Sequence, residues 1–309
     1  MTYLVTGATG FIGKRLVETL LAGGHSVHYL GRKRSAAMDL RAAFHPWPEP
    51  QRTLAPLDSV PRCDAIVNLA GESLAQRWTA EVKKEIENSR TLVTRNLVEA
   101  LSRVHHKPGV LVSASGVGYY GDRGDEVLTE QSPPGSGGFL AHVCAEWERE
   151  AERAGEAGLR VVRIRIGVVL SAEGGALHKM LPPFRLGVGG RLGDGQQWMS
   201  WIHRDDLIGI MRWAAENDAV SGALNGTAPE PVTNQQFTRV LARALHRPAM
   251  LPVPRFALRV MLGEMSDVLF ESARAIPAVA QSRGFPFTYD RLVDAIGREL
   301  SSPAAVASL

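Results

Sequence analysis

Three glycines at three-residue spacing, Gly7, Gly10 and Gly13, form the pattern in this sequence that points most directly to chemistry. They separate an apolar strand expected over residues 3–5 from a helix expected over residues 11–21. In that context the first glycine permits a tight turn, the second admits a pyrophosphate, and the third lets the helix pack on the sheet. The helix N-terminus adds unpaired N–H groups and a partial positive charge. We therefore expect a dinucleotide here, the alternative being a glycine-rich turn without a ligand. The other residues of the turn expected at the dinucleotide are Thr9, Phe11 and Ile12.

The end of the second expected strand, residues 25–30, indicates which dinucleotide fits. In folds of this kind an acidic residue at that position accepts the 2′-hydroxyl of NAD. Here Gly31 removes the acid, and Arg32 offers a planar guanidinium to a 2′-phosphate. The alternative is a solvated basic turn. The sequence therefore favours NADP(H) over NAD(H).

A long helix expected from residue 79 to about residue 104 carries an arginine on its apolar face. Arg90 lies four residues after Ile86 and three before Val93, within the stripe that faces the core. An unpaired buried charge is costly, so Arg90 needs an anionic partner. Glu85 lies at the edge of the same face. The two residues either form a structural ion pair or line the cofactor site.

Strands and helices alternate through the first 166 residues, which predicts a parallel sheet covered by helices on both faces. A buried strand over residues 64–70 ends at Gly71, and Leu69 and Ala70 at its end are expected beside the cofactor. A weak strand is expected near residues 53–55. Further elements expected in this part are strands over residues 110–115 and 159–166 and a helix over residues 138–157.

The second part of the chain is richer in glycine and proline. We expect helices starting near residue 205 and over residues 234–245, and a short strand over residues 223–226. The expected organisation is a dinucleotide-binding domain over residues 1–247, a smaller α-rich C-terminal lobe over 248–297, and a frayed tail over 298–309. The fold class is α/β, a doubly wound parallel sheet of the NAD(P)-binding Rossmann type.

Composition excludes several classes of protein. The net charge of +3 is small, the basic residues are scattered, and no array of stacking aromatics accompanies them, so nucleic acid is not an expected partner. Only Cys63 and Cys144 occur, which suits a reducing compartment. No apolar stretch is long enough to span a membrane, and we expect neither a metal site nor a targeting segment. The expected location is the cytoplasm. The oligomeric state is left open.

Several segments together resemble one superfamily. They are Thr6–Gly13, Asn68–Gly71, Ser113–Ser115 with Tyr120-Gly121-Asp122, and Trp201-Ile202-His203 with Asp205-Asp206-Leu207. The chain resembles the extended short-chain dehydrogenases/reductases, and more closely their atypical, sugar-nucleotide-epimerase-like branch of epimerase family proteins. The resemblance implies a Rossmann core, an NADP site and a smaller substrate lobe. It places nicotinamide near Ser113, Ala114 and Val169, and suggests an unidentified small-molecule substrate, with nucleotide-linked compounds as one candidate class.

The chain departs from the superfamily at the proton-transfer pair. Its oxidoreductases use a tyrosine and a lysine four residues later on one helix face, where the lysine lowers the pKa of the tyrosine. Among five tyrosines only Tyr29 has such a lysine, Lys33, and it lies on the adenosine side. Leu140 and Cys144 align with the missing pair. His142, nearby on the same helix, can titrate near neutrality but is better explained by a local hydrogen bond.

The remaining candidates near nicotinamide are hydroxyl groups. Ser115 lies nearest the usual catalytic serine position, and Tyr120 is a weaker candidate for proton donor. Arg185 and Arg191 either bind an anionic substrate or are surface charges. His203, Asp205 and Asp206 begin a helix, and their acids are well explained as caps. Two hypotheses follow: an NADP(H)-dependent, epimerase-like oxidoreductase, or an NADP(H)-binding sensor or assembly protein without turnover.

Overall fold

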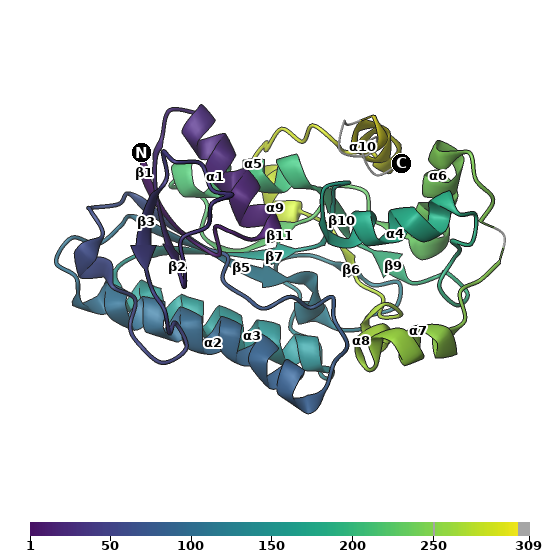
Figure 1. Cartoon of the computed structure of the whole chain (residues 1–309), viewed down its shortest axis with the longest axis horizontal. Helices are drawn as coiled ribbons and strands as arrows, with labels where there is room; N and C mark the ends of the chain where they lie inside the picture. The colour runs from purple at the N-terminus through teal and green to yellow at the C-terminus, as the bar shows by residue number, and fades with distance from the viewer. Residues whose placement is uncertain (250, 302–309) are drawn as a thin grey trace.

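A seven-stranded parallel sheet forms the centre of the computed structural model, which describes residues 1–249 and 251–301 (Figure 1). The strand order is β11-β7-β5-β4-β1-β2-β3, and every neighbouring pair is parallel. This is the doubly wound Rossmann arrangement, as predicted. The strands are β1 (Thr2–Thr6), β2 (Ser26–Gly31), β3 (Ala43–Pro46), β4 (Ala65–Asn68), β5 (Val110–Gly116), β7 (Arg160–Ile166) and β11 (Gly222–Gly226).

Helices cover both faces of the sheet because the strand side chains alternate. Tyr3 and Val5 point to the face covered by α1 (Phe11–Ala22), α5 (Arg204–Glu216) and α9 (Ala278–Ser282). Leu4 points to the opposite face, covered by α2 (Ala80–Arg103) and α3 (Phe139–Glu152). Both faces are therefore apolar cores, which is the usual condition of an all-parallel sheet (Figure 1).

The boundaries of α2 follow its capping residues. The Thr79 hydroxyl accepts a hydrogen bond from Val82 N, so the helix begins where its sequence predicts. The strand expected near residues 53–55 is wrong, because β3 lies earlier, at Ala43–Pro46. The 53–55 segment instead packs against α2, and Ala55 N donates a hydrogen bond to Asn96 O over 3.4 Å. An edge strand that pairs on one side only leaves a weak apolar pattern, which explains the error.

The C-terminal part packs against the core domain through short strand pairs and helices. Its elements, and those of the connecting segments, are α4 (Gly175–Arg185), α6 (Asn234–Leu245), α7 (Arg255–Leu262), α8 (Met265–Val268), α10 (Leu292–Leu300), β6 (Val127–Leu128), β8 (Val168–Leu170), β9 (Trp198–Met199), β10 (Trp201–His203), β12 (Val232–Thr233) and β13 (Arg274–Ala275). β13 pairs with β6, β10 with β8, and β12 with β9.

The prediction that a frayed tail begins at residue 298 is wrong about the starting residue. α10 continues to Leu300, and Glu299 within it is buried against β8 and β10. Residues 302–309 lie outside the described part of the chain.

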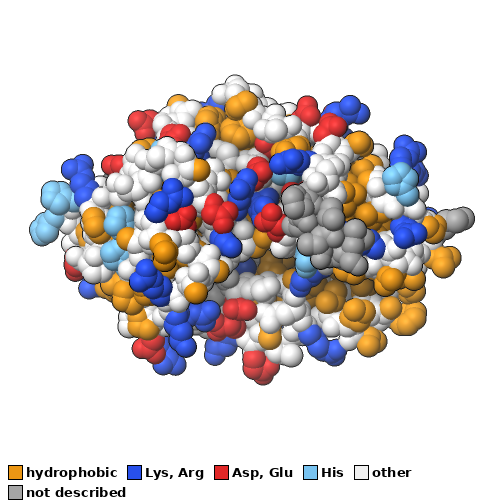
Figure 2. Space-filling model, turned by 45° about the horizontal axis from the view of Figure 1, so that its top comes forward, with side chains coloured by type: hydrophobic (Ala, Val, Ile, Leu, Met, Phe, Trp, Pro, Cys, Tyr) orange, Lys and Arg blue, Asp and Glu red, His pale blue; other side chains and the backbone are white. Residues whose placement is uncertain are grey.

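The surface mixes charges of both signs. Figure 2 shows Lys and Arg side chains interspersed with Asp and Glu on the face in view. Among the described residues, no helix is long and apolar enough to cross a membrane.

Candidate functional site

The glycine turn between β1 and α1 is shaped by close backbone contacts. A Cβ on Gly7, whose φ is +66°, would lie 2.4 Å from Leu69 O, and one on Gly13 would lie 2.2 Å from Gly7 O. Gly10 precedes α1, and no side chain caps the helix N-terminus. The turn therefore needs glycine at positions 7 and 13 and leaves N–H groups of α1 for an anion.

The turn opens at the carboxyl edge of the sheet where the chain reverses its direction of winding. β1 lies between β2 and β4. The chain crosses to opposite sides of β1 to form these two strands, which makes a crevice of the kind in which Rossmann folds bind ligands. Leu69, Ala70 and Gly71 follow β4 directly and form the opposite wall. The glycine turn and residues 69–71 are thereby brought to one edge of the sheet. Ala114 lies in β5 of the same sheet, and Val169 lies in β8, which belongs to a separate two-stranded sheet.

The adenosine end of this crevice is basic. Gly31 ends β2, and Arg32 follows it with an exposed side chain, as do Lys33 and Arg34. No acidic residue takes the place that NAD-specific folds give to one. This geometry fits a 2′-phosphate.

A buried polar network joins the strand ends under the crevice. Thr6 Oγ1 donates to Asn68 Oδ1 over 2.6 Å, and Asn68 Nδ2 donates to Thr94 Oγ1 over 2.9 Å and to Ser113 Oγ over 3.2 Å. Asn68 and Ser113 are fully buried. The Ser113 side chain, expected near the cofactor, is therefore committed to holding β4 and β5 in register. The Asn68 amide belongs to the same network, a role that sequence reasoning missed.

Arg90 lies beside the crevice, but the prediction that Glu85 is its partner is wrong. Glu85 accepts a hydrogen bond from Gln51 Nε2 over 2.6 Å. Arg90 instead donates to Ile86 O over 3.0 Å and to Glu72 O over 2.9 Å. Its guanidinium lies 5.3 Å from the centre of the Trp147 ring, and a Cβ on Gly71 would lie 3.1 Å from it.

The electrostatic state of Arg90 favours an anionic ligand. Burial lowers the pKa of the guanidinium, which nevertheless stays charged. No carboxylate in the described part of the chain forms an ion pair with it. Two carbonyl groups and an indole face compensate this charge only in part. An anion at Gly71 would complete the compensation.

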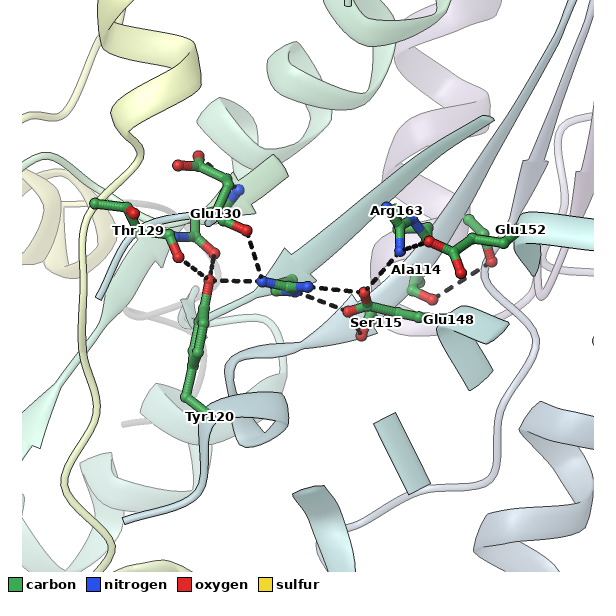
Figure 3. Close-up of polar contacts among 11 residues, drawn as sticks. Ala114, Ser115, Tyr120, Thr129, Glu130, Glu148, Glu152 and Arg163 are labelled. Atoms are coloured by element: carbon green, nitrogen blue, oxygen red, sulfur yellow. Dashed lines mark hydrogen bonds and ion pairs between the residues drawn. The ribbon is translucent and has the colours of Figure 1, made fainter. Parts of the chain in front are cut away.

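A buried ion pair lies behind Ser115 (Figure 3). Arg165 binds Glu148 in bidentate fashion, with Nε 2.9 Å from Oε1 and Nη2 3.0 Å from Oε2. Ser115 Oγ donates to the same Glu148 Oε1 over 2.8 Å. All three side chains are at most 4% exposed. The Ser115 proton is thus held by a carboxylate that is itself neutralised by an arginine.

Tyr120 belongs to the same network rather than to an open cleft. Its hydroxyl lies 2.9 Å from Thr129 O, 2.7 Å from Asn225 Oδ1 and 3.0 Å from Arg165 Nη1. Figure 3 shows the ring pointing toward the Thr129–Glu130 segment. The side chain is fully buried, and burial raises the pKa of its phenol. This arrangement favours a structural role over proton donation.

Leu140 and Cys144, the residues expected at the positions of the usual proton-transfer pair, are both buried apolar side chains of α3. Leu140 packs so closely on Gly118 that a Cβ on the glycine would lie 3.0 Å from Leu140 Cβ. Cys144 is buried, and this burial raises the pKa of its thiol to about 11. Neither residue can exchange a proton with a substrate near neutral pH.

The caps of α5 differ from those expected. His203 Nδ1, not an acid, accepts the hydrogen bond from Asp205 N over 3.1 Å. Asp205 instead pairs with Arg15, and Asp206 accepts hydrogen bonds from the backbone N of Thr288 and Tyr289. His203 Nε2 lies 2.9 Å from Glu299 Oε1. These groups therefore fasten the C-terminal segment to the core.

Two family models match separate parts of the chain. Residues 3–225 match the model of the NAD dependent epimerase/dehydratase family, and residues 253–298 match a model described as a domain of unknown function. The chain is 44% identical over 302 residues to the epimerase family protein SDR39U1 homolog, chloroplastic, of Arabidopsis thaliana, covering 96% of this chain and 86% of that protein.

A bacterial relative and a solved structure are similar over almost their whole lengths. Epimerase family protein YfhF of Bacillus subtilis is 38% identical, covering 99% of this chain and 100% of YfhF. The crystal structure of human epimerase family protein SDR39U1 (isoform 2) with NADPH superposes with a TM-score of 0.87 at 36% identity, covering 96% and 98% of the two chains.

Proposed function

Because the chain belongs to the NAD dependent epimerase/dehydratase family, we propose that it binds NADP(H) and acts as an epimerase-like oxidoreductase without the usual tyrosine–lysine pair. The observation that carries this proposal is the crevice itself. It combines a glycine turn closed to a Cβ at Gly7 and Gly13, a basic end at Arg32 and an incompletely compensated guanidinium at Arg90. The similar human protein crystallised with NADPH supports the same cofactor.

Different residues of the crevice bind different parts of the cofactor. The N–H groups at the start of α1 bind the pyrophosphate, and Gly10 leaves room for it. Arg32 binds the 2′-phosphate, and Arg90 provides positive charge beside Gly71. When bound, the nicotinamide supplies hydride transfer. Thr9, Phe11, Ile12, Leu69 and Ala70 contribute backbone and side-chain contacts along the groove.

Ser115 is proposed as a residue that orients the substrate rather than as an acid. Its proton points to Glu148, so its oxygen can accept a hydrogen bond from a substrate hydroxyl. Leu140 and Cys144 provide no proton relay. We therefore expect any proton that accompanies hydride transfer to come from the substrate or from solvent.

The alternative is an NADP(H)-binding sensor or assembly protein without turnover. The apolar helix face at Leu140 and Cys144 favours it, because nothing there replaces the lost acid. The loss of NADPH absorbance in the presence of carbonyl compounds and nucleotide sugars separates the two. Turnover of any of them supports an enzyme, and tight binding without turnover supports a sensor.

The cofactor proposal is tested by calorimetry with NADPH and NADH. Loss of a hydrogen bond to a charged group costs about 1.5–3 kcal/mol, so we expect Arg32→Ala to weaken NADPH binding by about 10- to 100-fold and NADH binding hardly at all. Arg103→Ala is the matched control, since Arg103 lies at the end of α2, where it pairs with Glu99. Equal affinities of the wild type for NADPH and NADH would refute the assignment.

We also propose that residues 248–297 form the lobe that faces the substrate, because β13 within them pairs with β6 beyond the end of β5. A small molecule is the proposed partner, with neither nucleic acid nor membrane involved. The cytoplasmic location stays a prediction.

A further inference from the structure

A buried arginine lies beside the first residue of α1. Arg204 begins α5, and its side chain is only 9% exposed. Its Nη1 lies 2.7 Å from Glu173 Oε2, and its guanidinium lies 5.2 Å from the centre of the Phe11 ring. Among the described residues, the buried Nε of Arg204 has no hydrogen-bond partner.

This placement is unfavourable for stability alone. A cation in the first turn of a helix opposes the helix dipole, and a buried N–H without an acceptor carries a desolvation cost. The acids that follow in α5 do not pair with this arginine, because Asp205 binds Arg15 and Asp206 binds backbone N–H groups. Glu173 is half-exposed, so its ion pair with Arg204 is partly screened by solvent.

The neighbourhood of Arg204 is the start of the phosphate-binding helix. Phe11 is the first residue of α1, and its N–H is among those left for the pyrophosphate. The Phe11 ring packs on the backbone of two glycines, where a Cβ on Gly174 would lie 2.6 Å and one on Gly175 3.0 Å from ring atoms. The segment that carries Glu173 is therefore held against the same helix end.

We propose that Arg204 is a cationic ligand for the pyrophosphate of the dinucleotide, alongside the N–H groups of α1, and that Glu173 holds it in place until the ligand binds. The guanidinium exchanges one carboxylate oxygen for phosphate oxygens, and its Nε–H gains an acceptor. Phe11 guides the exchange, because a guanidinium can slide across an aromatic face without losing its cation–π contact. This inference rests on the proposed NADP(H) binding and adds a residue to that site.

Two substitutions with opposite expected signs test it. In calorimetry, Arg204→Met should weaken NADPH and NADH by the same factor, about 10-fold, since the pyrophosphate is common to both. Inorganic pyrophosphate, used as a competitor, should likewise bind Arg204→Met more weakly than it binds the wild type. Glu173→Gln should tighten both dinucleotides about 3-fold, because the guanidinium no longer has a competing carboxylate. Arg15→Met is the matched control, since it removes a cation of α1 that pairs with Asp205, and it should change affinity less than 2-fold.

The outcomes separate this inference from the cofactor proposal. If wild-type protein bound neither dinucleotide, the cofactor proposal itself would fail. If it bound NADPH and a folded Arg204→Met bound it equally well, Arg204 would be structural only. Weaker binding by both Arg204→Met and Glu173→Gln would also overturn the inference, because it would show that the ion pair merely holds the loop. If Arg204→Met does not fold, Arg204→Lys replaces it, because lysine keeps the positive charge and lacks the planar guanidinium. The affinities of Arg204→Lys for NADPH and NADH should both fall by the same factor, smaller than that expected for Arg204→Met. Unchanged affinity would count against the inference.

Discussion

The substitutions Gly10→Ala and Gly13→Ala should have different effects, the first mainly on ligand binding and the second on both stability and binding. The Cβ of Gly13→Ala would lie 2.2 Å from Gly7 O and 2.7 Å from Ala8 Cα, both backbone atoms that cannot turn away. Overpacking of this kind costs about 1–3 kcal/mol, which exceeds the gain of at most about 1 kcal/mol from alanine in a helix. The helix must move off β1, so both stability and binding should fall.

Gly10→Ala meets a different neighbour. Its backbone is extended, with a φ of −75°, and the Cβ would lie 3.2 Å from Gly7 O. The cost to folding is that of a poorer N-cap, about 0.5 kcal/mol. The methyl group nevertheless occupies the space through which the pyrophosphate approaches the backbone. A clash worth about 1.4–3 kcal/mol then weakens NADPH binding by about 10- to 100-fold.

The assay pairs thermal unfolding with NADPH titration. Gly13→Ala should lower the melting temperature by about 5 °C, and Gly10→Ala by no more than about 2 °C. Gly297→Ala in α10 is the matched control, because a Cβ there has no atom within 4 Å and should leave binding unchanged. Wild-type affinity in Gly10→Ala would refute the role of this turn, and a fully stable Gly13→Ala would refute the packing argument.

Two further predictions concern buried charges. Arg90→Met should weaken NADPH binding about 10-fold or more with little loss of stability. Arg95→Met, further along α2, should lower stability only, because it removes one ion pair of buried Glu150, which keeps its pair with Arg153. Calorimetry and melting curves measure both, and normal binding by Arg90→Met would exclude Arg90 as a ligand. Burial alone would raise the pKa of Glu299, but hydrogen bonds from His203 and Ala172 N overcome this and hold it below its usual value. A depressed folded-state pKa stabilises the protein above the unfolded pKa of about 4.3, and that stability is lost as the pH falls through the folded value. Melting curves from pH 6 to pH 3 should therefore fall more steeply for wild type than for Glu299→Gln, and parallel curves would contradict this.

Local patterns predicted most of the sheet and its helices. The run over residues 64–70 and the helix from Thr79 carry strong periodicity and a cap, and both formed where expected. The prediction of a strand near residues 53–55 was wrong because edge strands carry a weak apolar pattern. This segment instead forms a backbone hydrogen bond with α2. The predicted start of the tail was wrong because Glu299 is held by contacts with His203 in β10 and with Ala172 after β8, both distant in sequence.

Side-chain partners at the site were less predictable than the elements that carry them. Arg90 was correctly placed on the core-facing side of α2, where it is partly buried, but Glu85, one turn and a half earlier on the helix, binds Gln51 instead. Ser115 was selected as a candidate from its position in the sequence, whereas its hydrogen bond to Glu148 depends on how α3 packs against β5. The pairing of Arg165 with that glutamate joins β7 to α3 and has no local signal.

The spacing of Gly7, Gly10 and Gly13 was enough to predict a tight turn between β1 and α1, since a backbone conformation and a helix end depend on neighbouring residues alone. The absence of a tyrosine–lysine pair could likewise be found by inspection of five tyrosines. Only the folded chain decided what surrounds the turn. Glu148, Arg165 and Arg204 acquire their roles from contacts between segments far apart in sequence, because burial and pairing of charges depend on packing that no local pattern encodes.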